Sequence, residues 1–282
     1  MEQKNLVRSE RVKGIIKVIA LAVLLVIISL IFFDSSMTLI SKWLKFTESY
    51  GHGFLVLYII FFEIYKKSSE LKFTKPTLGA LVFSILSSTV TLITWKLSLD
   101  YQVQLIEQLA VYTLWVLTIP LLFSFSAIRI LWFPLFFFVF ALPVWDQLND
   151  LLVIWTSKAV SVMLVSTPVT FHLYDNVIEL PFGTLIIADS CSGLRYLIVG
   201  AAMATYAAYT EKLTVAQGAA FIVIGVAVSI LANWIRVMLL TVIGYYTKME
   251  SSLMTDHDNF GLILFFVLFF PLLLVITKKV KA

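Results

Sequence analysis

Long apolar runs recur along this chain, and short segments that hold most of its charged residues separate them. Of its 282 residues, 60% are hydrophobic and 13% are charged, whereas soluble domains are about 25% charged. About 20 consecutive apolar residues suffice for a helix to cross the core of a bilayer. The sequence therefore predicts an all-α polytopic membrane protein. About eight spanning helices are expected, at residues 14–33, 54–65, 78–99, 103–125, 130–144, 194–209, 215–246 and 260–276.

The two longer segments between these runs are expected to lie outside the hydrocarbon. Residues 34–53 are interpreted as a loop with an interfacial stretch around Trp43 and Phe46. Residues 149–165 have apolar side chains at helical spacing, which predicts a helix in the interface or packed on the bundle. Residues 176–188 hold two β-type runs around a Pro-Phe-Gly turn, which predicts a β-hairpin. With no internal repeat and no low-complexity linker, residues 1–282 are expected to form a single domain, without an additional C-terminal domain.

The basic residues predict how the chain lies in the membrane, because Lys and Arg accumulate in cytoplasmic loops. With eight spans and the N-terminus inside, 14 of the 21 Lys and Arg residues fall on the cytoplasmic side. His52, Cys191 and His257 then fall on the outer side. These side chains are therefore expected at the extracytoplasmic face of the membrane.

Cys191 is the only cysteine, so an internal disulfide and a paired-cysteine metal site are excluded. It is expected at or just before the first turn of the helix over 194–209, after the predicted hairpin. Unpaired backbone N–H groups and the helix dipole favour a thiolate there, and thiolate is the nucleophilic form. Arg195, four residues on, adds positive charge. The alternative interpretation is a small buried packing residue, the commoner role of a lone cysteine.

Arg236 and His257 are predicted to reach the same side of the membrane as Cys191. Arg236 lies 21 residues after Val215, about 32 Å along a helix, or one hydrocarbon thickness. A Cys–His pair can activate a thiol, and an Arg can orient a carbonyl or stabilise an oxyanion. This set of side chains predicts acyl transfer through a thioester. The alternatives are a snorkelling cation for Arg236 and an ordinary loop residue for His257.

The remaining histidines carry less information. A structural role in a turn is favoured for His52, which lies between two glycines, and His172 has no supporting context. No two His or Cys residues share a ligand spacing, so we expect neither a metal site nor a cofactor.

Three motifs resemble those of the exosortase/archaeosortase family: Asp-Ser-Cys-Ser-Gly-Leu-Arg at 189–195, Asn-Trp-Ile-Arg at 233–236, and His-Asp-Asn-Phe-Gly at 257–261. Further matches occur in order along most of the chain, at residues 50–54, 132–134, 141–143 and 176–181. One departure is Ser190, where the family more often has Ala.

The resemblance implies a membrane-embedded cysteine transpeptidase or protease in a bacterial cytoplasmic (inner) membrane. Cys191 would be the nucleophile, Arg236 the carbonyl-orienting or oxyanion residue, and His257 the acid/base. The supporting residues would be Ser192, Gly193, Arg195, Asn233 and His52. The implied substrates are exported proteins with a C-terminal sorting signal, namely a short motif such as Pro-Glu-Pro, a transmembrane helix and a basic cluster. Membrane lipids and an envelope acceptor are the other expected partners, and nucleic acid is not one.

Two alternatives remain open at this point. A transporter or scaffold for envelope polysaccharide export would use Arg195 and Arg236 to hold an anionic ligand, without catalysis. Such a transporter should show repeated halves or discontinuous helices, and the sequence shows neither. Within the enzyme hypothesis, the sequence does not decide between hydrolysis and transfer to an acceptor.

Overall fold

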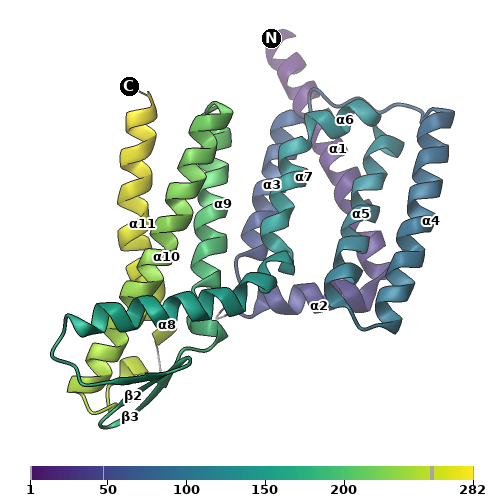
Figure 1. Ribbon diagram of the computed structural model, residues 1–282. Coiled ribbons are helices and arrows are strands. Elements are labelled where there is room, and N and C mark those ends of the chain that lie inside the picture. The colour runs from purple at the N-terminus through teal and green to yellow at the C-terminus, as the bar shows by residue number, and fades with distance from the viewer. Residues whose placement is uncertain (1, 47, 255–256, 282) are drawn as a thin grey trace. The chain divides into compact units, whose positions relative to one another are not determined.

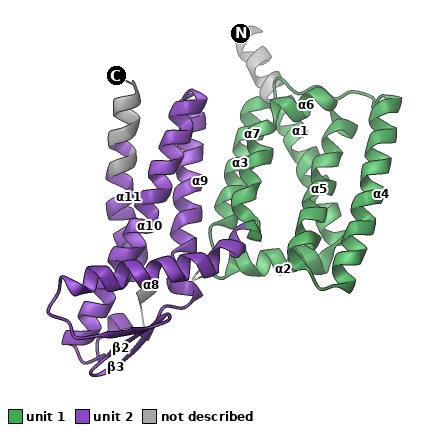
Figure 2. Ribbon diagram, in the orientation of Figure 1, with its two compact units in different colours: residues 1–46, 50–144 green, residues 47–49, 145–282 purple. Residues whose placement is uncertain are grey.

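The protein was analysed as a computed structural model that describes residues 2–46, 48–254 and 257–281. For residues 2–11, 257–259, 272, 273 and 275–281 it describes the backbone alone. The chain divides into two compact units. Unit 1 comprises residues 1–46 and 50–144, and unit 2 comprises residues 47–49 and 145–282 (Figure 2). The expected single domain stays a prediction.

Unit 1 is a helical bundle (Figure 1). Helices α1, α3, α4 and α5 run roughly alongside one another, and shorter helices connect them at both ends. Its elements are α1 (Glu2–Ile31), α2 (Phe33–Leu44), α3 (Gly53–Lys67), α4 (Leu78–Asp100), α5 (Gln104–Leu122), α6 (Phe125–Ile130), α7 (Trp132–Phe137) and the 3₁₀ turn η1 (Phe138–Ala141).

Helix α2 corrects the expectation of a loop over residues 34–53. Ser35, Leu39 and Trp43 are buried at four-residue spacing, so one side of this helix packs on the bundle. Asp34 in its first turn faces the positive end of the helix dipole. Figure 1 shows α2 running across the bundle end instead of along it. The predicted stretch around Trp43 is therefore the end of a longer helix, which begins at Phe33.

The run at residues 130–144, expected as one span, is broken into short pieces. Helix α6 ends at Ile130 and α7 begins at Trp132, with Pro134 in the first turn, where a missing N–H is tolerated. The 3₁₀ turn η1 follows and ends before Leu142, which is extended at φ −96° and ψ 145°. Proline disfavours helical backbone in the residue before it, and Pro143 explains this break.

Most basic residues of unit 1 lie at one of its ends. Lys17 Nζ on α1 donates to the Ser68 carbonyl at 2.8 Å, just after α3 ends. The Thr74 N–H donates to the Leu122 carbonyl at 3.2 Å, at the end of α5. The basic loop at residues 66–75 therefore lies beside the N-terminal half of α1, as the predicted topology requires.

Unit 2 combines helices with a small sheet. Its helices α9, α10 and α11 run alongside one another, while α8 runs across them (Figure 1). Its elements are α8 (Asn149–Val165), β1 (His172–Tyr174), β2 (Val177–Leu180), β3 (Gly183–Ile186), η3 (Asp189–Cys191), α9 (Leu194–Thr210), α10 (Val215–Tyr246), η4 (Ser252–Met254) and α11 (His257–Lys281). The 3₁₀ turn η2 (Pro143–Leu148) leads from unit 1 into α8.

The predicted hairpin is part of a three-stranded antiparallel sheet in the order β1-β2-β3. Val177 pairs with Ile186 and Leu180 with Gly183, as the predicted turn requires. Strand β1, which was not predicted, pairs Tyr174 with Val177 through a two-residue turn. Buried apolar residues of the sheet pack with residues of α8 and α10, and this cluster contains Ile178, Leu180, Ile187, Val160, Leu164, Val237 and Cys191.

Small residues bring α9 and α10 into close contact. A Cβ added at Gly225 would lie 2.9 Å from the Ala204 Cβ and 3.5 Å from the Gly200 carbonyl oxygen. A Cβ added at Gly200 would overlap the Ser229 hydroxyl. Close packing through small residues is a common way to hold two membrane helices together. This close packing of α9 and α10 places Cys191, just before α9, beside the second half of α10.

Five stretches of the described residues are long and apolar enough to cross a membrane: Val12–Ile31, Leu78–Asp100, Gln104–Leu122, Pro143–Val165 and Val215–Tyr246. The protein is thus a multi-pass membrane protein, but eight spans are not established. Helices α3 and α9 have only 15 and 17 residues, fewer than about 20. Although Pro143–Val165 is long enough, its α8 part runs across its neighbours, which supports the predicted interfacial or packed placement.

Candidate active site

The turn that carries Cys191 is a 3₁₀ turn, η3, followed by Ser192 and Gly193 before α9 begins at Leu194. The predicted position just before the helix is confirmed. Gly193 has φ +95°, a left-handed conformation that a side chain disfavours. A Cβ there would also lie 2.7 Å from Asn233 Nδ2. Glycine is therefore required twice over, for the backbone conformation and for the close approach of α10.

Asn233 connects this turn to α10. Its Nδ2 donates to the Cys191 carbonyl at 2.9 Å and lies 3.5 Å from Thr156 Oγ1 on α8. Thr156 Oγ1 in turn donates to the Ser192 carbonyl at 3.0 Å. All of these groups are buried. Buried polar groups are costly unless they are paired, so this network fixes the turn between α8 and α10.

Ser192 closes the network on its other side. Its hydroxyl donates to Asn149 Oδ1 at 2.6 Å, lies 2.8 Å from the Asp189 carbonyl and accepts from the Leu194 N–H at 3.2 Å. The last contact satisfies one of the free N–H groups at the start of α9. Asn149 and Thr156 were not identified from the sequence. A polar residue at the start of an apolar helix, or one inside it, gives no signal of which loop it will contact.

The thiol of Cys191 lies at the boundary between this network and the apolar cluster of unit 2. The residue is 8% exposed and packs in the cluster with Ile187 and Val237. The Ser190 hydroxyl lies 4.0 Å from its Sγ atom. Burial alone also fits the packing interpretation. A cysteine that only fills space would not need the polar network that fixes this turn, so the network favours the nucleophile interpretation.

Arg236 is fully buried, at 1% exposure, within α10. The helix continues beyond it to Tyr246, so the snorkelling alternative is wrong: the side chain does not reach water. Its Nη1 lies 3.5 Å from Asn233 Oδ1, and its Cζ lies 5.6 Å from the centre of the Tyr196 ring. A Cβ added at Gly261 of α11 would overlap both Arg236 and the Tyr196 hydroxyl. Three helices thus meet around this guanidinium.

His257 is the first residue of α11 and lies one turn before Gly261. The structure therefore brings the first turn of α11 to the level of Arg236, as the predicted site requires. The side chain of His257 lies outside the described residues.

The other predicted residues are placed less centrally. Arg195 is half-buried on the first turn of α9 and has no hydrogen bond or ion pair with any other described residue. His52 belongs to unit 1, where its Nε2 lies 2.9 Å from the Phe140 carbonyl and its ring stacks on Tyr50. These contacts support the structural role favoured for His52. His172 is exposed on β1.

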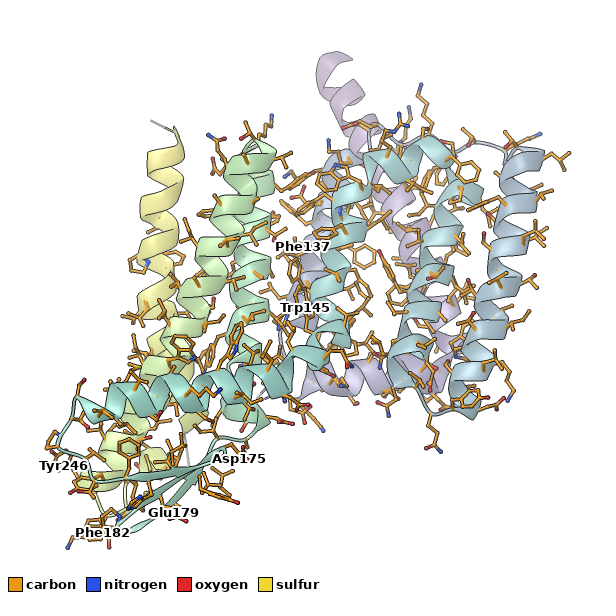
Figure 3. The ribbon with its side chains drawn as sticks, viewed as in Figure 1. Phe137, Trp145, Asp175, Glu179, Phe182 and Tyr246 are labelled. Atoms are coloured by element: carbon orange, nitrogen blue, oxygen red, sulfur yellow. The ribbon has the colours of Figure 1, made fainter. Side chains whose placement is uncertain are left out.

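A polar cavity of about 450 Å³ adjoins η3. It lies between α8 and the sheet, and Figure 3 shows Asp175, in the turn between β1 and β2, below α8. Three carboxylates and one ammonium line it, from Asp150, Asp175, Asp189 and Lys158. Asp189 belongs to the same turn as Cys191, so this cavity adjoins the turn that carries the candidate nucleophile, although Cys191 itself is not part of its lining.

Fold and site together define a multi-pass membrane protein in which a polar network holds a cysteine-bearing turn beside a buried arginine. A family model described as transmembrane exosortase matches residues 43–274. The chain therefore belongs to the exosortase family. No curated protein and no solved structure matches it.

Proposed function

We propose that this protein is a cysteine transpeptidase or protease that cleaves the C-terminal sorting signal of exported proteins. The observation that carries the proposal is the convergence of the Cys191 turn, Asn233, buried Arg236 and the first turn of α11 on one end of unit 2. These are the three motif segments of the sequence, and each comes from a different element.

The reaction would proceed in two steps. Cys191 Sγ attacks the carbonyl carbon of the scissile peptide bond, while His257 takes the thiol proton. The C–S bond forms, the C–N bond breaks, and His257 returns the proton to the leaving amine. An amine of an envelope acceptor, or water, then attacks the thioester and releases the thiol. Arg236 would orient the carbonyl or stabilise the developing oxyanion.

Asn233 is proposed as a positioning residue. Its amide donates to the Cys191 backbone, not to the thiol, and its carbonyl oxygen lies near the Arg236 guanidinium. One side chain therefore sets the distance between nucleophile and cation.

The proposed location is the cytoplasmic membrane of a bacterium, with the site on the extracytoplasmic face. Support comes from within unit 2. Helix α9 separates Cys191 from Lys212 by 17 helical residues, or about 25 Å. Helix α11 likewise separates its first turn from the lysines at its end, Lys278, Lys279 and Lys281. These four lysines are thus remote from the candidate site, as the positive-inside rule expects of cytoplasmic helix ends.

The test is processing of a tagged exported protein that carries the short motif, membrane helix and basic cluster. Cys191→Ala should leave it at its uncut mass, and Cys191→Ser should be strongly impaired, because a hydroxyl is harder to deprotonate. Ser190→Ala, at the exposed neighbouring position, is the matched control and should process normally. Mass spectrometry of the wild type should detect an acyl adduct on Cys191 that hydroxylamine removes. Normal processing by a membrane-inserted Cys191→Ala protein would refute the proposal.

A further inference from the structure

Unit 1 contains a second cavity that the proposed chemistry does not use. It has a volume of about 390 Å³, within the range of small-molecule sites. Its walls come from α1, α2, α3, α5 and η1, and none of the residues that line it carries a charge. Apolar rim residues are well exposed, among them Leu30, Phe33 and Met37. The cavity is therefore an uncharged pocket that opens through apolar side chains.

Three residues that line it hold four buried polar atoms with no hydrogen-bond partner in the described part of the chain. These atoms are Ser36 Oγ, both polar atoms of the Gln108 amide and the Trp115 indole nitrogen. Gln108 is only 2% exposed. Burying an unpaired amide is costly, and native structures leave few such groups. An amide buried without a partner, in the wall of an open pocket, indicates a bound polar atom.

The position of Gln108 and Ser36 relative to the membrane indicates what kind of molecule supplies the polar atom that pairs with them. Ser36 lies on the buried side of α2, which runs across the end of the bundle and carries exposed Lys45 just beyond its end. An amphipathic helix of this kind lies at the boundary between headgroups and acyl chains. Next to Ser36, Ser35 Oγ donates to Glu107 Oε2 on α5 at 3.1 Å, which places Gln108 at the same level. Trp115 lies seven residues further along α5, about 10 Å deeper.

We propose that this cavity binds one acyl chain of an ester-linked glycerophospholipid from the surrounding bilayer. The Gln108 Nε2 and the Ser36 hydroxyl donate to the ester carbonyl, and Gln108 Oε1 accepts from water at that boundary. The chain itself fills the apolar part along α1 and α3. A substrate's spanning helix does not fit: a 20-residue helix about 10 Å wide and 30 Å long occupies roughly 2,400 Å³. The uncharged lining also excludes a free fatty acid anion or a phosphate group inside the pocket.

The experiment compares two lipids that differ only in the carbonyl. Purified full-length protein is titrated with a diester phosphatidylcholine and with its diether analogue of the same chain length, and binding is followed by native mass spectrometry. Wild type should bind the diester about tenfold more tightly, the equivalent of one hydrogen bond of about 1.4 kcal/mol. Gln108→Leu should lose this preference while its diether affinity stays within about twofold. Equal binding of both lipids by the wild type would overturn the proposal, even if the variant fails to fold.

Control variants separate the cavity from general effects. Ser36→Ala should reduce the diester preference. Ser84→Ala, a buried serine on α4 that also lacks a partner among the described residues, lies outside the cavity and should not. A photo-crosslinking residue at Met37, on the rim, should capture lipid in cells. Capture of a polypeptide instead, or a preference that survives Gln108→Leu, would show that the occupant or the contact is wrong. Because the cavity lies in unit 1, processing by Cys191 can fail without affecting this result.

Discussion

A fully buried arginine is the most unusual residue of the site. Charged side chains are almost never fully buried unless they are paired. Arg236 lies against the amide oxygen of Asn233, one turn earlier on its own helix, and against the aromatic face of Tyr196 on α9, and a glycine of α11 makes room for it. The planar guanidinium of arginine can make several such contacts at once, whereas the ammonium of lysine is a point charge and cannot. The geometry of Arg236, and not its charge alone, is therefore expected to matter.

This argument predicts that Arg236→Lys is nearly as damaging as Arg236→Ala. Both should lower the rate of substrate processing by about 10²–10³-fold, the usual effect of removing one oxyanion donor. Arg129→Lys makes the same exchange at an exposed position at the end of α6 and should process normally. Cleavage rates and membrane levels of all three variants are compared. Wild-type processing by Arg236→Lys would mean that a general positive charge suffices.

Sequence reasoning identified the residues of the site that stand in motifs and missed those that do not. Cys191, Gly193, Asn233 and Arg236 lie in short segments of polar residues within apolar surroundings, and the structure brings them together. The role of Thr156, in contrast, depends on α8 crossing beside the Cys191 turn. That arrangement arises from tertiary packing, and the sequence of α8 alone does not show which segments it will contact.

At the scale of elements, the α9–α10 pair sets the site, because Asn233 contacts the Cys191 turn only while these helices stay close. We therefore predict that Gly225→Ala both destabilises unit 2 and reduces processing. The new methyl group would meet the Ala204 methyl at 2.9 Å, and neither side chain can rotate away. Overpacking of this kind costs about 1–3 kcal/mol, which thermal unfolding of the purified protein would detect.

Gly79→Ala is the matched control for this change. Gly79 lies in the first turn of α4, where a Cβ would meet no atom within 4 Å. Replacing an unstrained helical glycine with alanine should be neutral or slightly stabilising. If Gly225→Ala melted at the wild-type temperature and processed substrate normally, close helix packing would not be what holds the site.

The elements that the sequence predicted well have a long periodic pattern or a strong turn signal. Helices α4 and α10 and the β2–β3 hairpin belong to this group. Strand β1 is only three residues long, and it is extended mainly because it pairs with β2. Helix α2 begins with residues typical of loops, and its stability comes from the face that packs on unit 1. In residues 130–144 composition predicted a span, but the backbone leaves the α-helix at Leu131 and becomes extended at Leu142, before Pro143.

At the scale of the whole molecule, the basic residues of unit 1 lie mostly at one end, whereas unit 2 has four at the end remote from Cys191 and four on the side of the site. In unit 1 the hydrogen bond from Lys17 to Ser68 places the loop at residues 66–75 beside α1. In unit 2 the turn at Lys212 lies at the far end of α9 from Cys191. Unit 1 thus carries the charge argument for orientation, because only its basic residues are divided unequally between the two ends.

The prediction is that the sheet faces outward and both basic loops face the cytoplasm. Single cysteines are introduced into Cys191→Ala protein at exposed positions Tyr174, Ser69 and Thr214, on β1, in the basic loop of unit 1 and before α10. A membrane-impermeant maleimide should label Tyr174→Cys in cells whose inner membrane is intact. Ser69→Cys and Thr214→Cys should react only after that membrane is permeabilised. If Tyr174→Cys were protected while Thr214→Cys reacted, unit 2 would have the opposite orientation, and Cys191 would face the cytoplasm, where it could not process a protein after export.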